Sequence, residues 1–157
     1  MPETQTPPPP FGQIVAVAQR ALSAALDDLL GEAGTTFQRW AALNMLAARG
    51  SAPLDALRRE VAEALQADER SIAELFDQLE SDGLIQTAGD RGAPDGTRIE
   101  LTAGGETLHR SLRESIGRLS ARILGGLDPH DIGTTIRTLR EVTERAQSLP
   151  TGQPART

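Results

Sequence analysis

The sequence predicts a mainly α-helical protein with one small β-hairpin, and three patterns support this fold class. Apolar residues recur at intervals of three and four along most of the chain, which places them on one side of a helix. Glycine, proline and capping residues interrupt this pattern repeatedly. The period shortens to that of a strand only between residues 84 and 101. We therefore expect helices before and after a single hairpin.

Four helices are expected before the hairpin. The first covers residues 11–30, and the second follows a capping residue at Thr35 or Thr36 and ends near residue 50. A third helix is expected over 51–65, with Ser51 opening it and a proline in its first turn. A break at residues 66 and 67 separates it from a fourth helix over 68–81, which a glycine closes.

The hairpin and two more helices make up the second half of the chain. Residues 84–87 and 97–101 form short strand-like runs, separated by a stretch rich in glycine, proline and aspartate. Thr102 then caps a long helix that ends at a pair of glycines, residues 125 and 126. The last helix begins at Asp128 with a proline in its first turn. The expected order is thus four helices, a hairpin and two helices.

Length and composition favour one domain that folds without covalent or metal support. The chain has 157 residues, an ordinary size for a single domain. It contains no cysteine, which excludes a disulfide framework and a thiolate metal site. We expect a single domain over 11–149, disordered tails over 1–10 and 150–157, and a cytoplasmic protein, because neither a secretory signal nor a membrane span is apparent.

The element order indicates a winged helix-turn-helix head over residues 36–101. Three helices followed by a two-stranded hairpin are the parts of that fold, with the hairpin as its wing. The helices outside the head, over 11–35 and 102–149, carry apolar stripes that a head of this size cannot cover. We expect these flanking segments to be dimerisation helices that join two copies into a homodimer.

The sequence resembles the MarR family of bacterial transcription regulators over residues 11–149. The resemblance is carried by TTFQRWAALNML at 35–46, LFDQLESDGLI at 75–85, and LTAG at 101–104 after the wing. It implies a dimer that places one recognition helix per subunit in successive major grooves of double-stranded DNA, with each wing at the adjacent minor groove. It also implies regulation by a small-molecule effector bound near the junction of the dimerisation and DNA-binding regions.

The resemblance also implies roles for individual residues. The recognition helix is 68–81, and its implied DNA-contacting residues, together with two from the wing, are Arg70, Ser71, Ala73, Glu74, Gln78, Arg91 and Arg98. An effector pocket beneath the first, second and fifth helices implies that Trp40 lies near His109. The chain departs from the family pattern in three ways. Glu74 stands where a basic residue is common, the wing GDRGAPDGTR is shorter, and the helix before the recognition helix is longer than usual.

The charge of the head suggests a second interpretation. Residues 49–100 hold six arginines and twelve acidic residues, so they carry the whole net charge of −6. DNA-binding proteins draw much of their affinity from cations at phosphates, and Arg58 and Arg59 join Arg70 as candidates for that role. The alternative is a divergent winged-helix module that binds a protein through an acidic recognition helix, with weak or no DNA binding.

No pattern in the chain indicates an enzyme. The two histidines, His109 and His130, lie in no nucleophile or metal motif. Asp128 and Asp131 flank His130, but an Asp-Pro-x-Asp sequence is typical of a helix start. The glycine-rich stretch 89–96 has no lysine and precedes a strand, unlike a phosphate-binding loop. We expect no catalytic residue, metal or cofactor.

Overall fold

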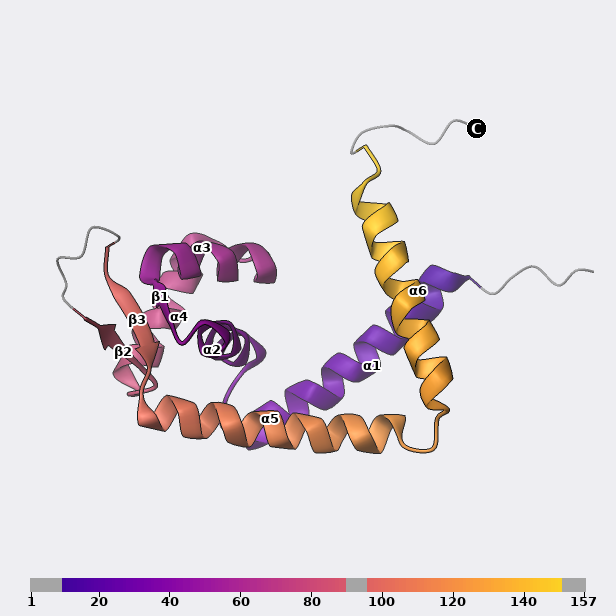
Figure 1. The fold of residues 1–157 in the computed structure, drawn as a ribbon, viewed down its shortest axis with the longest axis horizontal. Coiled ribbons are helices and arrows are strands. Elements are labelled where there is room, and N and C mark those ends of the chain that lie inside the picture. Colours follow the sequence, from indigo (N-terminus) through magenta and orange to yellow (C-terminus); the bar gives the residue numbers. More distant parts are fainter. Residues whose placement is uncertain (1–9, 90–95, 151–157) are drawn as a thin grey trace, which may run out of the picture. The chain divides into compact units, whose positions relative to one another are not determined.

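The computed structural model describes residues 10–89 and 96–150. Its elements follow the predicted order with one additional strand (Figure 1). They are α1 (Phe11–Glu32), α2 (Phe37–Arg49), β1 (Ser51–Pro53), α3 (Leu54–Leu65), α4 (Glu69–Ser81), β2 (Ile85–Ala88), β3 (Arg98–Leu101), α5 (Ala103–Leu124) and α6 (Pro129–Gln147). The expectation of a mainly helical fold with a small hairpin is confirmed. Two compact units divide the chain, residues 1–119 and residues 120–157.

Local sequence determines where several helices begin and end. The Thr36 side chain accepts a hydrogen bond from the N–H of Arg39 at 3.3 Å, which caps α2 as predicted. The Asp128 carboxylate accepts from the N–H of His130 at 2.7 Å, so it caps α6 as predicted. Gln66 ends α3 in the left-handed region, with φ of 51°. These boundaries depend on residues within one helical turn.

The expectation that Ser51 opens the third helix is wrong. Residues Ser51–Pro53 form β1, which pairs antiparallel with β3 in a sheet of order β1-β3-β2. Ser51 lies opposite Glu100, and the helix begins only at Leu54, whose N–H donates to the carbonyl of Thr97 at 2.8 Å. The wing hairpin is therefore a three-stranded sheet, because a segment before α3 returns to it.

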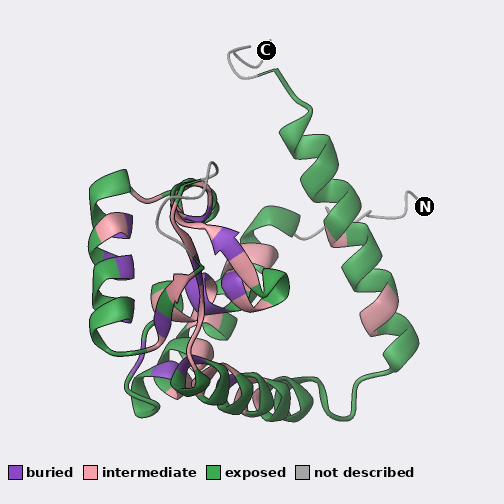
Figure 2. Ribbon diagram, turned by 60° about the vertical axis from the view of Figure 1, so that its left-hand side comes forward, coloured by how far each residue is buried: buried purple, intermediate pink, exposed green. Residues whose placement is uncertain are grey.

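One hydrophobic core holds the head together. It joins the inner sides of α2, α3 and α4 to one face of the small sheet, and Figure 2 shows the buried residues gathered there. Its members are Ala42, Leu43, Leu46, Ala52, Leu57, Val61, Ile72, Leu75, Phe76, Leu79, Ile85 and Ile99. The three helices and the sheet are thus fixed relative to one another through shared apolar contacts.

The flanking helices leave apolar surface uncovered. On α1, Phe11, Ile14, Val17 and Leu22 are each about half exposed, with exposed fractions of 49–54%. The second unit contains α6, on which no residue is buried (Figure 2). No helix in the described ranges is long and apolar enough to cross a membrane. The tails expected to be disordered lie outside the described residues, apart from Pro10 and Pro150.

The start of α5 is hydrogen-bonded to the turn that follows α4, where the hairpin begins. The N–H of Thr102 donates to the carbonyl of Leu84 at 3.0 Å, and the Thr102 side chain caps α5 by accepting from the N–H of Gly105 at 3.0 Å. Gly105 is buried against this carbonyl. A Cβ atom on Gly105 would lie 2.0 Å from the carbonyl oxygen of Leu84, a distance that backbone atoms cannot accommodate.

We predict that Gly105→Ala destabilises the head by about 3 kcal/mol, because the new methyl group forces α5 away from the hairpin. Gly104→Ala is the matched control, since its nearest neighbours would lie 3.6 Å from the new Cβ, and we expect a change below about 1 kcal/mol. Urea denaturation of both variants measures the difference. Equal stabilities would contradict the tight contact between α5 and the hairpin.

Candidate nucleic-acid interface

Burial of one side of α4 determines which of its residues face outward. Ile72, Leu75, Phe76 and Leu79 are all buried in the core. The opposite side is exposed and includes Arg70, Glu74 and Asp77, which are spaced four and three residues apart and so form one row along the helix. We call these three residues the outer row of α4. It is the surface that a ligand docking on α4 would meet first.

The other three predicted contact residues of α4, namely Ser71, Ala73 and Gln78, lie on the two flanks of this row. Ser71 and Gln78 are exposed and line a shallow hollow with residues 36, 38 and 39 at the start of α2. Ala73 is half-buried, on the flank toward α3, where a hollow of about 300 Å³ also contains Arg58 and Arg59. The structure therefore brings the five predicted residues of α4 to one exposed surface. The hollow beside it holds two basic residues, Arg58 and Arg59, and two acidic ones, Asp55 and Glu69.

Ser71 also stabilises the start of α4. Its N–H and its hydroxyl donate to the two carboxylate oxygens of Asp68, at 2.8 and 2.7 Å. These hydrogen bonds, the side-chain bond first, lower the pKa of the Asp68 carboxyl. Asp68 is therefore an ionised N-cap. Asp68 was predicted to lie within the recognition helix, whereas in the structure it immediately precedes Glu69, the first residue of α4.

Acidic neighbours pair with most arginines of the described head. On the outer row, the Arg70 guanidinium lies 3.2 Å from the Glu74 carboxylate, one turn away. Arg58 on α3 lies 3.2 Å from Asp77. Two further ion pairs join Arg39 to Asp82 and Arg49 to Glu60. The cations that would contact phosphates are therefore partly neutralised by carboxylates of the same surface.

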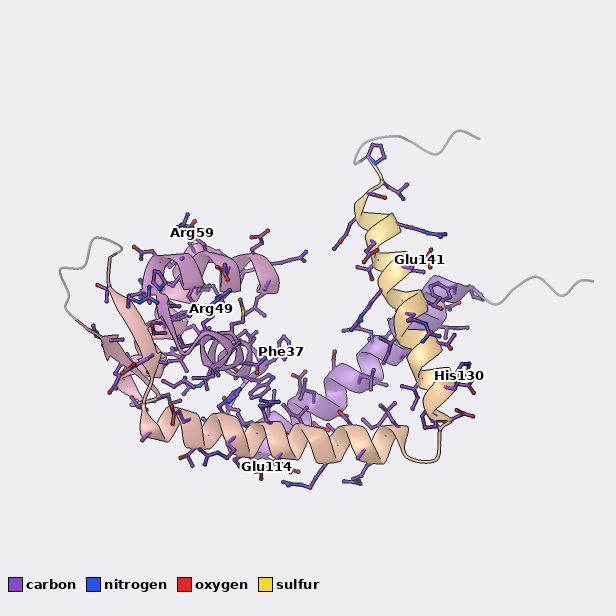
Figure 3. All side chains as sticks on the ribbon, viewed as in Figure 1. Phe37, Arg49, Arg59, Glu114, His130 and Glu141 are labelled. Carbon is purple, nitrogen blue, oxygen red and sulfur yellow. The ribbon has the colours of Figure 1, made fainter. Side chains whose placement is uncertain are left out.

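Arg59 differs from these residues, since it has no carboxylate partner within the described ranges. It lies on α3 (Figure 3), is exposed, and its Nε–H donates to the carbonyl of Asp55 at 3.3 Å. A backbone carbonyl carries no net charge, so the positive charge of Arg59 is not neutralised by this bond. Arg59 is thus a cation beside α4 that is available to an anionic ligand.

The two arginines expected in the wing have different positions. Arg98 is the first residue of β3 and is half-buried, and its Nη2 donates to the carbonyl and the hydroxyl of Ser51 at 3.1 and 3.0 Å. These bonds tie β3 to β1, so Arg98 supports the sheet. Arg91 lies outside the described residues.

A second region joins α2 to α5, and it contains the predicted pair Trp40 and His109. Their rings stack with centroids 5.2 Å apart and planes inclined by 17°. His109 Nε2 lies 3.0 Å from Oδ1 of Asn44, one turn after Trp40 on α2. Asn44 was not predicted, and the spacing of four residues from Trp40 is the one signal that could have identified it.

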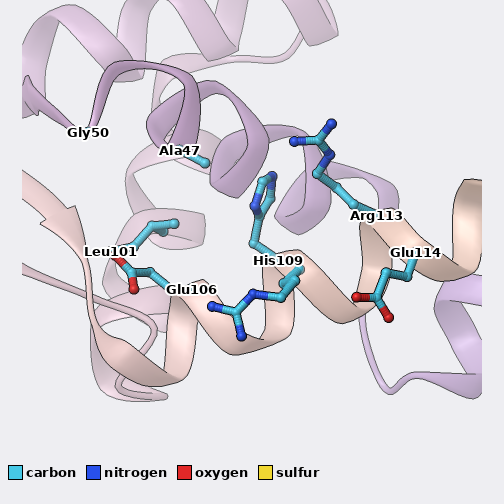
Figure 4. A pocket seen from close by; sticks show the side chains of 8 residues that line it. Ala47, Gly50, Leu101, Glu106, His109, Arg113 and Glu114 are labelled. Atoms are coloured by element: carbon cyan, nitrogen blue, oxygen red, sulfur yellow. The ribbon is translucent and has the colours of Figure 1, made fainter.

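A hollow of about 570 Å³ opens beside His109 (Figure 4). Its walls come from the end of α2, the end of β3 and the first half of α5. Its charged residues on α5 are Glu106, Arg110, Arg113 and Glu114, two of each sign. Of the two stacked residues, His109 lines this hollow and Trp40 does not.

Burial, and secondarily the positive charge of Arg113, lower the pKa of His109 from its ordinary value of about 6.5. The His109 imidazole therefore binds a proton less readily in the folded chain than in the unfolded chain. Above about pH 6.5 the group has no effect on stability, and below that pH protonation of His109 favours unfolding.

We predict an imidazole pKa below about 6.5 for His109 in an NMR titration, and a smaller loss of stability under acid conditions in His109→Gln. An imidazole pKa at or above that value would contradict this environment.

No family model matches the sequence. Solved structures match nearly the whole fold. The transcriptional regulator PA3341 is 26% identical, with a TM-score of 0.72, over 88% of this chain and 99% of that one. PcaV, a transcriptional regulator from Streptomyces coelicolor, is also 26% identical, with a TM-score of 0.68, over 88% of this chain and 98% of that one.

A mutant of MarR from E. coli, complexed with operator DNA, matches with a TM-score of 0.67 at 18% identity. The match covers 85% of this chain and 93% of that one. These matches cover 85–88% of this chain, which agrees with the resemblance found in the sequence. The chain therefore has the winged-helix fold of the MarR-family transcriptional regulators.

Proposed function

We propose that this protein is a transcription regulator that binds double-stranded DNA as a homodimer, with α4 as its recognition helix. The observation that carries the proposal is the outer face of α4. This face is exposed along the whole helix and lies beside Arg59, within a head that has the winged-helix order of elements. A helix in this position of a winged-helix head enters the major groove. The similarly folded E. coli MarR, whose mutant was solved in complex with operator DNA, supports DNA as the ligand.

The uncovered apolar side chains support a dimer. Phe11, Ile14, Val17 and Leu22 on α1 remain about half exposed, and a second copy of the chain would remove such surface from water. A dimer also presents two recognition helices, as recognition of successive major grooves requires. We propose that the flanking helices form this dimer interface.

The hollow beside His109 is our proposed site for a small-molecule effector. Its volume of about 570 Å³ lies within the usual range for small-molecule sites. Arginine and glutamate side chains in its walls offer hydrogen-bond donors and acceptors, which suits a polar molecule. Because α5 is locked to the hairpin through Thr102 and Gly105, a ligand that shifts α5 would also act on the head.

A second candidate function is protein binding by the acidic head. It is favoured by the exposure of the Glu74 and Asp77 side chains, 62% and 73%, and by six acidic residues against one arginine over 68–82. Carboxylates on this face repel phosphates and would attract a basic protein surface. The DNA-binding measurement below distinguishes the two functions.

We predict that Ile14→Glu converts the protein toward monomer, because it places a charge in the proposed interface. Gln13→Glu is the matched control, since Gln13 is an exposed polar residue of the same helix. Sedimentation equilibrium measures the mass of each variant. A monomeric parent protein, or equal dimerisation of both variants, would contradict the role of α1.

We predict saturable binding to a fragment from upstream of the protein's own gene, tighter at about 50 mM than at about 200 mM salt. Arg59→Ala and Arg70→Ala each lower the slope of the salt dependence by about 1 if the side chain meets a phosphate. Arg140→Ala, an exposed arginine of α6, serves as the control for total charge. Absence of binding by a folded dimer at the lower salt would reject the proposal and favour the protein-binding alternative.

A further inference from the structure

We propose that Asp77 is an affinity-limiting residue, which weakens the binding of the head to any DNA duplex by occupying Arg58. This inference rests on the proposed function, because it requires that α4 face DNA. The role concerns an ion pair between two helices, which contributes little to the stability of the fold. The pair joins residues nineteen positions apart, Arg58 on α3 and Asp77 on α4.

The geometry holds Arg58 in place beneath the carboxylate. The guanidinium carbon of Arg58 lies 5.8 Å from the centre of the Phe76 ring, so a cation–π contact anchors it to the core. Its Nη2 donates to Oδ1 of Asp77 at 3.2 Å. The Arg58 side chain is 28% exposed and that of Asp77 is 73% exposed. A molecule approaching this surface therefore meets the carboxylate before the cation.

The other ion pair of the outer row is built differently. The Arg70 side chain is 90% exposed and its only described partner is Glu74, one turn away on the same helix. Arg70 can turn toward a phosphate without losing any packing. Arg58 cannot do so without leaving Phe76. We expect Asp77 to limit DNA affinity more strongly than Glu74 for this reason.

The Arg58–Asp77 ion pair lies at the protein surface, where water screens it. An ion pair on a protein surface contributes little to stability, so replacing Asp77 leaves the fold intact. Near a DNA phosphate, however, the same carboxylate cancels a favourable charge and adds a repulsive one. Neutralising Asp77 should therefore strengthen binding to all sequences, because the contact is to the phosphate backbone.

Asp77→Asn is the direct test, because asparagine keeps the size and polarity of the side chain but removes the charge that neutralises Arg58. The probe is a labelled duplex of about three helical turns and mixed sequence, titrated by fluorescence anisotropy at about 50 and 200 mM salt. We expect affinity at the lower salt to rise about fivefold or more, and the salt slope to steepen by about 1. Adding Arg58→Gln to Asp77→Asn should reverse most of the gain.

Glu80→Gln is the matched control. Glu80 is an exposed carboxylate of α4 without an ion pair among the described residues, so the variant changes the net charge equally and frees no arginine. We expect its gain to stay below about twofold. Thermal denaturation of each variant checks that the head remains folded. Equal gains in Asp77→Asn and Glu80→Gln, or no gain in Asp77→Asn, would overturn the inference.

The outcomes separate this inference from the proposed function. If the parent protein binds DNA and Asp77→Asn binds no better than Glu80→Gln, only the role of Asp77 is rejected. If neither the parent protein nor any variant binds the duplex at the lower salt while all are folded, both the proposed function and the inference are rejected.

Discussion

Burial of the inner side of α4 is the interaction on which the rest of the structure depends. Ile72, Phe76 and Leu79 are at most 2% exposed, and each such side chain contributes roughly 1.5 to 3 kcal/mol when buried. These contacts join α4 to α2, α3 and the sheet, and they also fix the rotation of α4 about its axis. The outward position of Arg70 and Asp77 is thus a consequence of core packing rather than of their own contacts.

The same packing creates an unusual balance of charge on the outer surface. Arg58 and Arg70 each form an ion pair with a carboxylate, whereas Arg59 forms none within the described ranges. A winged-helix head with this surface relies on few unpaired cations, so its affinity for DNA should be sensitive to small changes in charge. This balance of charge separates the chain from a strongly basic DNA-binding head.

The sequence predicted those parts of the fold that depend on neighbouring residues. Thr36 and Asp128 were identifiable as caps because a cap and its partner lie within one turn. The strand Ser51–Pro53 was missed, because three residues show no period and their partner strand lies far along the chain. The ion pair of Arg58 and Asp77 was not predicted either, since no spacing rule relates residues on two packed helices. The proximity of Trp40 and His109 came from the family resemblance, not from their spacing.

Amide NMR of the intact protein tests most directly whether the outer surface of α4 contacts DNA. Titration with a short duplex should produce its largest chemical-shift changes in α4, around Arg70 and Gln78, and in the part of α3 that contains Arg59. Changes confined to other helices, such as α6, or no change at low salt in a folded protein would contradict the account.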